Sequence, residues 1–286
     1  MGSGVCVEPV IDSHVHIISP ELCREVQPHI LKDDFLSQIC SSPQHRFVSA
    51  DELLEEMDRC GVTRAAICSF PFADEGLCRA INDYLLGAAR EHPQRFLPMA
   101  AVDPRQRWME REIARCDEAG AAGVGELFPW GQNFDLAGAA AARLAGCCRE
   151  RGLPLLLHIN EPVGHPYAGK GTVCVKEGAA FALAHPRLQI IYAHWGGGLL
   201  FYELMPEIKR GLKDVYYDTA AGPFLYQPGI YRTAREIGVL HKILLGTDYP
   251  LISPGRYLKE LAASGLSPAE QRLIRGENAA KLFAGA

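Results

Sequence analysis

Several common signatures are missing from this sequence of 286 residues, and each absence excludes a class of protein. The 10 cysteines are scattered and form no C-x-x-C pair, so we interpret them as buried, reduced thiols. No run of about 18 uninterrupted apolar residues occurs, and the N-terminus lacks the charged and apolar segments of a secretory signal. We therefore expect a soluble, cytoplasmic protein that has no membrane partner.

Charge is spread evenly along the chain. Charged residues make up 22% of the sequence, the formal net charge is −5, and no block of like charges gathers basic residues on one face. Nucleic acid is therefore not an expected partner, whereas a small-molecule substrate is expected and a homo-oligomer is allowed. No repeat, low-complexity segment or linker divides the chain, so we expect one domain over residues 1–286.

The sequence does contain a regular alternation of short apolar runs and helical patterns. Eight runs are solidly apolar, as in buried parallel strands, and no glycine-rich phosphate loop follows the first of them. One helical pattern opens with a capping box, Ser49-x-x-Glu52, and ends before Gly61. We predict an α/β fold, a single (β/α)8 TIM barrel with a lid-like insertion after strand 1 and extra C-terminal helices. The runs are 10–16, 64–70, 96–102, 123–128, 153–159, 188–195, 215–219 and 242–248.

The most informative motif is DSHVH, in which one residue separates His14 from His16 at the end of the first run. Residues i and i+2 of a strand point to the same face, so both imidazoles can reach one metal ion. The motif alone is weak, because a chain with 10 histidines produces it often by chance. It gains weight because His158, His194 and Asp248 close three later runs, LPLLLHI, LQIIYAHW and KILLGTDYP. Strand ends of this kind meet at the mouth of a barrel.

These segments resemble the amidohydrolase superfamily, in particular its amidohydrolase-related (family 2) group of metal-dependent hydrolases and decarboxylases. The matching pieces are IDSHVH, LLLHINEP, IIYAHWGGG, LLGTDYPL and GENAAKLF, which span nearly the whole chain in the family's order. The resemblance implies the same barrel and assigns roles to five residues. By it, Asp248 is a metal ligand or proton carrier, His194 is a second-metal ligand or a catalytic residue, and the metal ligands are His14, His16 and His158.

The chemistry of these side chains gives an independent reason for a metal site. Neutral imidazole and carboxylate suit Zn²⁺ and similar divalent ions, and a catalytic zinc site keeps one position open for water. The ion lowers the pKa of that water from about 15.7 to about 7, which supplies hydroxide near neutral pH. Asp248 is then the expected catalytic base, with capping of the following helix as its alternative role. We expect one or two divalent ions, with zinc as the first choice.

Glu126, in the run GVGELF, decides between mechanisms. A carboxylate on an apolar buried strand is costly unless it is paired or metal-bound. By the same resemblance, the fourth strand of some superfamily branches supplies a carboxylate that bridges two metals, whereas decarboxylase-like branches commonly lack this bridge. We expect Glu126 to be a bridging ligand; the alternative is an ion pair with Lys170 or with an arginine at the rim.

The loops that follow two of the predicted strands are expected to contact the substrate. NEPVGHPYAGKG and WGGGLLFY are glycine-rich, so their backbones can pass close to a ligand or can simply form tight turns. Lys170 is the expected partner of a substrate carboxylate, and Trp195 is expected to form an apolar wall. Asp218 is interpreted as a helix cap rather than as a partner of a metal ligand.

Three functions of different classes are consistent with this site. The first is a metal-dependent hydrolase that uses a metal-activated water on an amide, ester or lactone-type bond of a small molecule, and Glu126 favours it. The second is a metal-dependent nonoxidative decarboxylase of an aromatic or unsaturated carboxylic acid, which the HWGGG and TDYP segments resemble. The third is a non-catalytic barrel that binds a metal or a small molecule, and the full set of histidines disfavours it. The sequence leads us to predict the hydrolase.

Overall fold

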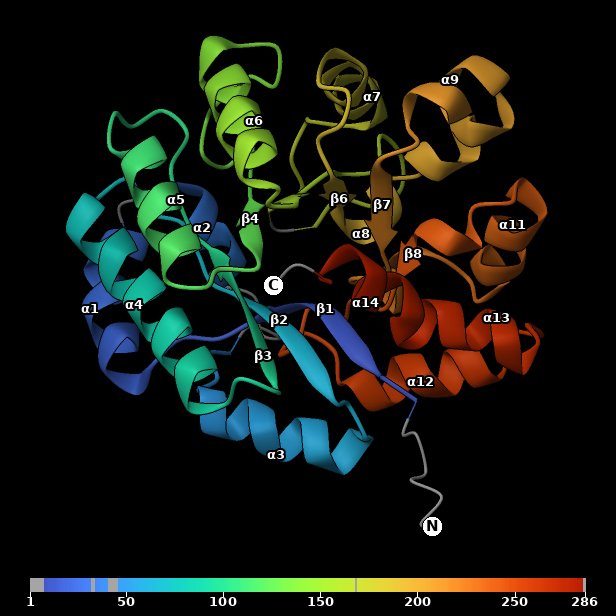
Figure 1. Cartoon of the computed structure of the whole chain (residues 1–286), viewed down its shortest axis with the longest axis horizontal. Coiled ribbons are helices and arrows are strands. Elements are labelled where there is room, and N and C mark those ends of the chain that lie inside the picture. The colour runs from blue at the N-terminus through green and yellow to red at the C-terminus, as the bar shows by residue number, and fades with distance from the viewer. Residues whose placement is uncertain (1–7, 32–33, 41–45, 168, 285–286) are drawn as a thin grey trace.

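Eight parallel strands, in the order β1 to β8, form a nearly closed barrel surrounded by helices (Figure 1). The computed structural model describes residues 8–31, 34–40, 46–167 and 169–284. Every strand lies inside one of the eight predicted apolar runs, and this confirms the predicted (β/α)8 barrel. The strands are β1 Ile11–His16, β2 Arg64–Cys68, β3 Phe96–Ala100, β4 Gly123–Leu127, β5 Leu155–Leu157, β6 Ile190–Tyr192, β7 Val215–Asp218 and β8 Ile243–Leu244.

The barrel closes through the segment that follows β8. The amide of Ser13 donates to the carbonyl of Leu245 at 2.7 Å, and the amide of Asp248 donates to the carbonyl of His14 at 2.9 Å. Val15 and Tyr249 form an isolated parallel bridge beyond these contacts. The chain after β8 is therefore held directly against the histidine motif of β1.

Helices alternate with the strands, as the sequence pattern predicts. In α3 the Ser49 side chain caps the Glu52 amide, the Glu52 side chain returns to the Ser49 amide, and Gly61 ends the helix in the left-handed region. No helix of the described residues has both the length and the apolar character needed to cross a membrane. The helices that pack outside the strands are α3 Ala50–Cys60, α4 Glu75–Glu91, α5 Met109–Glu118, α6 Ala139–Arg151, α7 Val175–Ala184, α9 Pro206–Gly211, α11 Gly229–Ile237 and α12 Pro254–Ala262.

The insertion after β1 folds into two helices, α1 Pro20–Ile30 and α2 Asp34–Cys40. Their apolar faces, which include Val26 and Phe35, join one core cluster with residues of β1 and β2. The insertion is thus packed onto the barrel near the carboxyl end of β1, where we predicted a lid.

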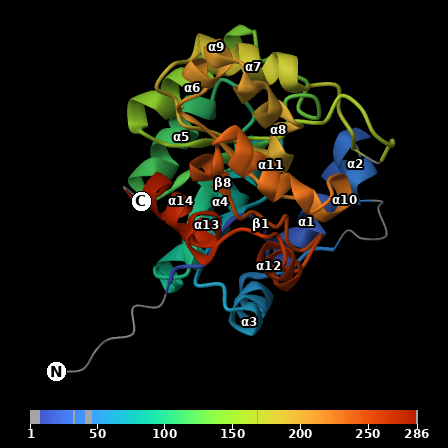
Figure 2. The same ribbon diagram turned by 90° about the vertical axis from the view of Figure 1, so that its right-hand side faces the viewer.

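The C-terminal helices cover the opposite end of the barrel. Helix α13 Pro268–Arg272 continues without a break through a π-helical turn, Leu273–Glu277, into α14 Asn278–Leu282 (Figure 2). Leu282 and Phe283 pack with inward-facing strand residues such as Ile11 and Leu244. This end is therefore closed by apolar contacts, and the polar residues at the carboxyl ends of the strands are left to form the site.

Candidate metal centre

The first strand places two imidazoles side by side inside the barrel. His14 and His16 are 0% and 8% exposed, and their Nε2 atoms lie 3.1 Å apart. Glu126 reaches the same point from β4 and is 2% exposed. The residue before it, Gly125, has φ +127°, and a Cβ there would lie 2.3 Å from the carbonyl oxygen of Leu156. Glycine is therefore required where β4 runs this close to β5.

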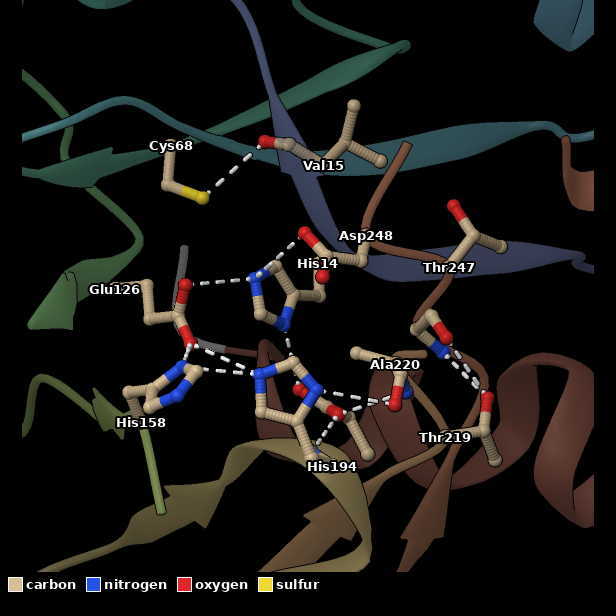
Figure 3. A network of polar contacts seen from close by, with 12 residues as sticks. His14, Val15, Cys68, Glu126, His158, His194, Thr219, Ala220, Thr247 and Asp248 are labelled. Atoms are coloured by element: carbon tan, nitrogen blue, oxygen red, sulfur yellow. Dashed lines mark hydrogen bonds and ion pairs between the residues drawn. The ribbon is translucent and has the colours of Figure 1, made fainter. Parts of the chain in front are cut away.

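One half of the centre gathers around His14 and His16. Glu126 Oε2 lies 3.2 Å from the Nε2 atom of each histidine. Asp248 Oδ1 lies 3.5 Å from His16 Nε2 and 3.9 Å from His14 Nε2. Two ring nitrogens and two carboxylate oxygens thus converge on one point, and Figure 3 shows His14, Glu126 and Asp248 turned toward one another.

The other half gathers around the second oxygen of Glu126. His158 Nδ1 lies 2.9 Å from Glu126 Oε1, and His194 Nε2 lies 3.5 Å from it. The two imidazole nitrogens are 3.0 Å apart. Glu126 therefore faces one histidine pair with each oxygen, and it does not form the ion pair with Lys170 that was its alternative.

The donor set fits a divalent cation. His14 Nδ1 lies 2.8 Å from Asp218 Oδ2, a carboxylate that accepts the ring N–H. A neutral imidazole has one N–H, so Nε2 of His14 presents a lone pair to Glu126 Oε2, which is also an acceptor. Acceptors that face one another in a buried place are unfavourable unless a proton or a cation lies between them. Imidazole and carboxylate ligands at these separations are the usual surroundings of a catalytic metal.

The electrostatics of the centre also favour a cation. Burial would lower the pKa of His14, but the carboxylates of Glu126 and Asp218 outweigh burial and hold it well above its usual value. Burial would raise the pKa of Glu126, but His14 and His158 hold it well below its usual value. The carboxylates therefore draw positive charge into this buried position, and a divalent ion would supply that charge.

Two residues of the centre have uncommon backbone conformations. His194 follows β6 with φ +59°, and Asp248 follows β8 with φ +58°. Residues other than glycine rarely adopt this left-handed backbone conformation. Those that do are concentrated at functional sites. The turns after β6 and β8 are thus held in conformations that aim both side chains at Glu126 and His16.

Asp218 and Asp12 support the centre from behind. Asp218 ends β7, is 0% exposed, and accepts from His14 Nδ1 and from the amides of His194 and Ala220. Its preferred interpretation as a helix cap is therefore wrong, because its carboxylate orients a histidine. Asp12 accepts from the Thr247 hydroxyl at 2.6 Å, and burial raises the pKa of Asp12 to about 7. In the sequence, both residues could have been found as carboxylates that lie within apolar runs predicted to be barrel strands.

A cavity of about 510 Å³ opens above the centre. His16, Glu126, His158, His194 and Asp248 lie at its floor. The remaining described lining residues are Ile17, Ile18, Ile39, Arg46, Phe47, Val48, Phe70, Phe128, His165, Tyr167, Gly169, Ala221, Phe224, Leu225, Pro250 and Leu251.

The two predicted substrate-binding residues do not line this cavity. The Lys170 ammonium lies 2.9 Å from Glu161 Oε1 and donates to the carbonyl of Val163, so it serves to hold its own loop. Trp195 is 1% exposed and packs against Tyr231 behind the turn. Both predictions are corrected, because an ion pair and a buried ring contact occupy these side chains. Among the described lining residues, the cation that was not predicted is Arg46, which comes from the insertion and carries no recognisable pattern.

Solved structures with the same fold include several decarboxylases. The chain is 16% identical to 5-carboxyvanillate decarboxylase from Sphingomonas paucimobilis, with TM-score 0.75 and coverage of 97% of this chain and 99% of that one. It is 17% identical to 5-carboxyvanillate decarboxylase from Novosphingobium aromaticivorans, solved with manganese, with TM-score 0.76 and coverage of 97% and 96%. It is 20% identical to 2,6-dihydroxybenzoate decarboxylase from Rhizobium, with TM-score 0.69 and coverage of 97% and 99%. No curated protein sequence matches the chain.

These similarities correct the predicted reaction, and they support a divalent metal without confirming zinc. The hydrolase prediction is contradicted, because several of the solved structures with this fold are decarboxylases, which favours the second of the three functions. A divalent metal is supported by the His and Glu cluster and by the family, but zinc is not confirmed, since some of the similar decarboxylase structures contain manganese.

The family itself follows from the sequence rather than from the fold. A family model described as Amidohydrolase matches residues 11–285, which include every strand and every residue of the centre. The chain belongs to this family of enzymes.

Proposed function

We propose that this protein is a metal-dependent nonoxidative decarboxylase of an aromatic or unsaturated carboxylic acid. One observation carries the proposal: the buried cluster around Glu126 forms the floor of a cavity whose described lining is largely apolar, includes several aromatic rings and contains one arginine. A flat acid is complementary to this arrangement, with its ring against the walls and its anionic groups toward positive charge at either end.

The aromatic wall is ordered by stacking. The rings of His16 and Phe70 are stacked with centroids 5.1 Å apart and an angle of 16° between planes. Phe70 and Phe128 are stacked at 6.3 Å and 23°. Phe47 meets Phe70 edge to face at 6.3 Å. These rings continue the wall from a metal-ligand candidate outward, so a planar substrate can stack on them while one carboxylate reaches the centre.

Arg46 is the one guanidinium among the described residues that line the cavity. It donates to the Tyr249 hydroxyl at 2.8 Å and lies over the ring of Tyr249. Tyr249 directly follows Asp248 in the chain, so the Arg46 guanidinium is anchored close to a candidate metal ligand. Its remaining N–H groups are suited to an anionic or phenolic oxygen of the substrate.

His14, His16, Glu126 and Asp248 would hold the first ion, and His158 and His194 would join Glu126 on a second. When bound, the metal supplies positive charge that orients the substrate's oxygens and offsets the charge that develops in the reaction. His14 is held in position by Asp218, and the walls exclude water from the reacting carbon.

Asp248 is the residue that we assign to proton transfer. Its side chain is 18% exposed and lines the cavity, whereas Glu126 is 2% exposed. As a carboxylic acid, Asp248 gives its proton to the ring carbon that bears the carboxylate, forming a C–H bond. The C–C bond to the carboxylate then breaks, CO₂ leaves, and the electron pair of that bond restores the unsaturated system. His194 faces the same cavity and is the second candidate for the proton.

The test is CO₂ release from a panel of hydroxybenzoates, carboxylated phenols and unsaturated dicarboxylates. The purified protein is assayed after loading with manganese or zinc and again after chelation. We expect metal-dependent CO₂ release from at least one member, with the decarboxylated product identified by mass spectrometry. Release of no CO₂ from any member by protein that carries stoichiometric metal would contradict the proposal.

A further inference from the structure

A thiol lies beside the centre and takes no part in the function proposed above. Cys68 is the last residue of β2, is 0% exposed, and is paired in register with His16 of β1. It belongs to the group of inward-facing residues that fill the barrel, together with Ala66 two positions earlier. Because neighbouring residues of paired strands point to the same face, its thiol lies in the same layer as the two histidines.

The sulfur is close enough to share an ion with both histidines. Cys68 Sγ lies 3.7 Å from His16 Nδ1 and 3.9 Å from His16 Nε2. One ligand atom each from His14, His16 and Cys68 lie within 4.8 Å of one another. Tetrahedral zinc has Zn–N bonds of about 2.05 Å and Zn–S bonds of about 2.3 Å, so its ligand atoms are about 3.3 Å apart for two nitrogens and about 3.6 Å for nitrogen and sulfur. The Nε2 atoms of His14 and His16 are 3.1 Å apart, and Cys68 Sγ lies 3.9 Å from the same His16 Nε2, so each separation is within about 0.3 Å of these values.

Cys78, another buried thiol among the described residues, belongs to no such group of metal-ligating side chains. Cys78 of α4 donates to the carbonyl of Ala101 at 3.0 Å, and Cys68 likewise donates to the carbonyl of Val15 at 3.2 Å (Figure 3). The two cysteines are therefore alike in burial and in their backbone contact. Only the surroundings differ, since converging lone pairs lie beside Cys68 and the packed interior of α4 surrounds Cys78.

We propose that the Cys68 thiolate is a protein ligand of the ion held by His14 and His16. A thiolate is a soft ligand that favours zinc and cobalt, whereas carboxylate and water suit manganese. This chain would then select zinc over manganese more strongly than a site of imidazoles and carboxylates does. The inference rests on the metal requirement of the proposed function and not on decarboxylation, so every measurement below is made without substrate.

The first experiment uses cobalt in place of the native metal. A thiolate bound to Co²⁺ gives an intense charge-transfer band in the near ultraviolet, which nitrogen and oxygen ligands do not give. We expect this band in the wild-type protein loaded with one equivalent of Co²⁺ and in Cys78→Ser, the matched control. In Cys68→Ser it should be lost while the weaker visible bands of bound cobalt remain. A band of equal strength in Cys68→Ser would overturn the proposal.

The second experiment needs no variant and so does not depend on how Cys68→Ser folds. X-ray absorption at the zinc edge of wild-type protein with one equivalent of zinc should require a sulfur scatterer at about 2.3 Å. A first coordination sphere of nitrogen and oxygen alone at about 2.0 Å would refute the assignment.

Competition between zinc and manganese, in the wild type and in Cys68→Ser, measures how strongly the thiolate makes the site select zinc. Removing a residue that hydrogen-bonds to a metal ligand weakens metal binding roughly 10–100-fold. Removing a ligand itself should weaken it more. We expect zinc affinity to fall by more than about 100-fold in Cys68→Ser while manganese affinity changes much less. An unchanged zinc-to-manganese ratio would count against the proposal even if the protein decarboxylates its substrate. A protein with the sulfur ligand but without CO₂ release would retain this inference and lose the proposed function.

Discussion

Two buried clusters of charged groups, both close to the barrel strands, differ in how their hydrogen bonds are completed. In one, Lys242 donates to both oxygens of Glu203 at 2.9 and 2.7 Å and to the carbonyl of Leu212. The Tyr217 hydroxyl donates to the same carboxylate at 2.7 Å. All three ammonium protons thus have acceptors, and Glu203 and Lys242 are only 1% and 4% exposed. This cluster is complete without any further group.

The centre at the mouth of the barrel is the opposite case. Glu126 faces four histidines with two oxygens, and several of the facing atoms are acceptors. A closed cluster of donors and acceptors contributes to the fold, whereas a cluster with an excess of acceptors needs a cation to complete it. The comparison predicts that substitutions in the first cluster change stability and that substitutions in the second change metal binding and turnover.

The largest effect is expected from Asp248→Asn. Asparagine keeps an oxygen for coordination but has no acidic proton, so turnover should fall by roughly 10²–10⁴, the usual contribution of a positioned acid or base. The measurement is the rate of CO₂ release on the substrate found in the panel, with metal content determined in parallel. A rate close to that of the wild type would show that the proton comes from elsewhere, with His194 the next residue to replace.

Lys242→Met should break the closed cluster. It leaves the Glu203 carboxylate buried without its cation, and removing one partner of a buried pair costs about 3–5 kcal/mol of unfolding free energy. Denaturant titration of the metal-loaded protein measures the loss, and zinc affinity should stay within about twofold of the wild type.

The matched control for that substitution is the double variant Glu203→Met and Lys242→Met. It removes both charges, so it should be more stable than Lys242→Met alone. If the single variant were as stable as the wild type, or bound metal much more weakly, the division between the two clusters would be wrong.

The parts of the molecule that were predictable are those governed by local pattern. Each apolar run became a strand because its side chains are buried on both faces, and the ends of those runs carried His14, His16, His158, His194 and Asp248 into one place. Glu126 was recognisable for a related reason, since a carboxylate in a buried run needs a partner. That reasoning predicted a partner for Glu126, and the structure places both histidine pairs beside it, while its role as a bridging ligand stays a prediction.

The substrate side was much less predictable, because it depends on how loops pack. Lys170 was expected to meet a substrate carboxylate, yet Glu161 in the same loop pairs with it. Trp195 follows a candidate ligand, but its left-handed backbone, φ +58°, turns the ring into the core. Arg46 reaches the cavity only because the insertion folds back over the barrel. Non-local contacts of this kind have no periodicity from which they could be predicted.

Removing the metal tests the same difference between the Glu203–Lys242 cluster and the centre around Glu126. Ligand binding to the folded state alone stabilises a protein by about 2.7 kcal/mol when the free ligand is at 100 times its dissociation constant. Chelation should therefore lower the melting temperature of the wild type, and it should lower that of Lys242→Met by a similar amount. A melting temperature that does not respond to metal would mean that the centre is complete without a cation.

The smallest effect in this series is expected from Asp218→Asn. Asp218 accepts the N–H of His14 and touches no lone pair of the centre, so the substitution should leave all candidate ligands in place while loosening one of them. Metal affinity should fall roughly 10–100-fold, as it does when such outer partners are lost. The matched control is Asp117→Asn on α5, a partly exposed carboxylate that lies 3.5 Å from Arg151 and far along the chain from the centre. Isothermal titration with zinc measures both variants. Equal affinities in the two would show that Asp218 serves only the packing of β7, whereas a selective loss would identify it as the residue that orients His14.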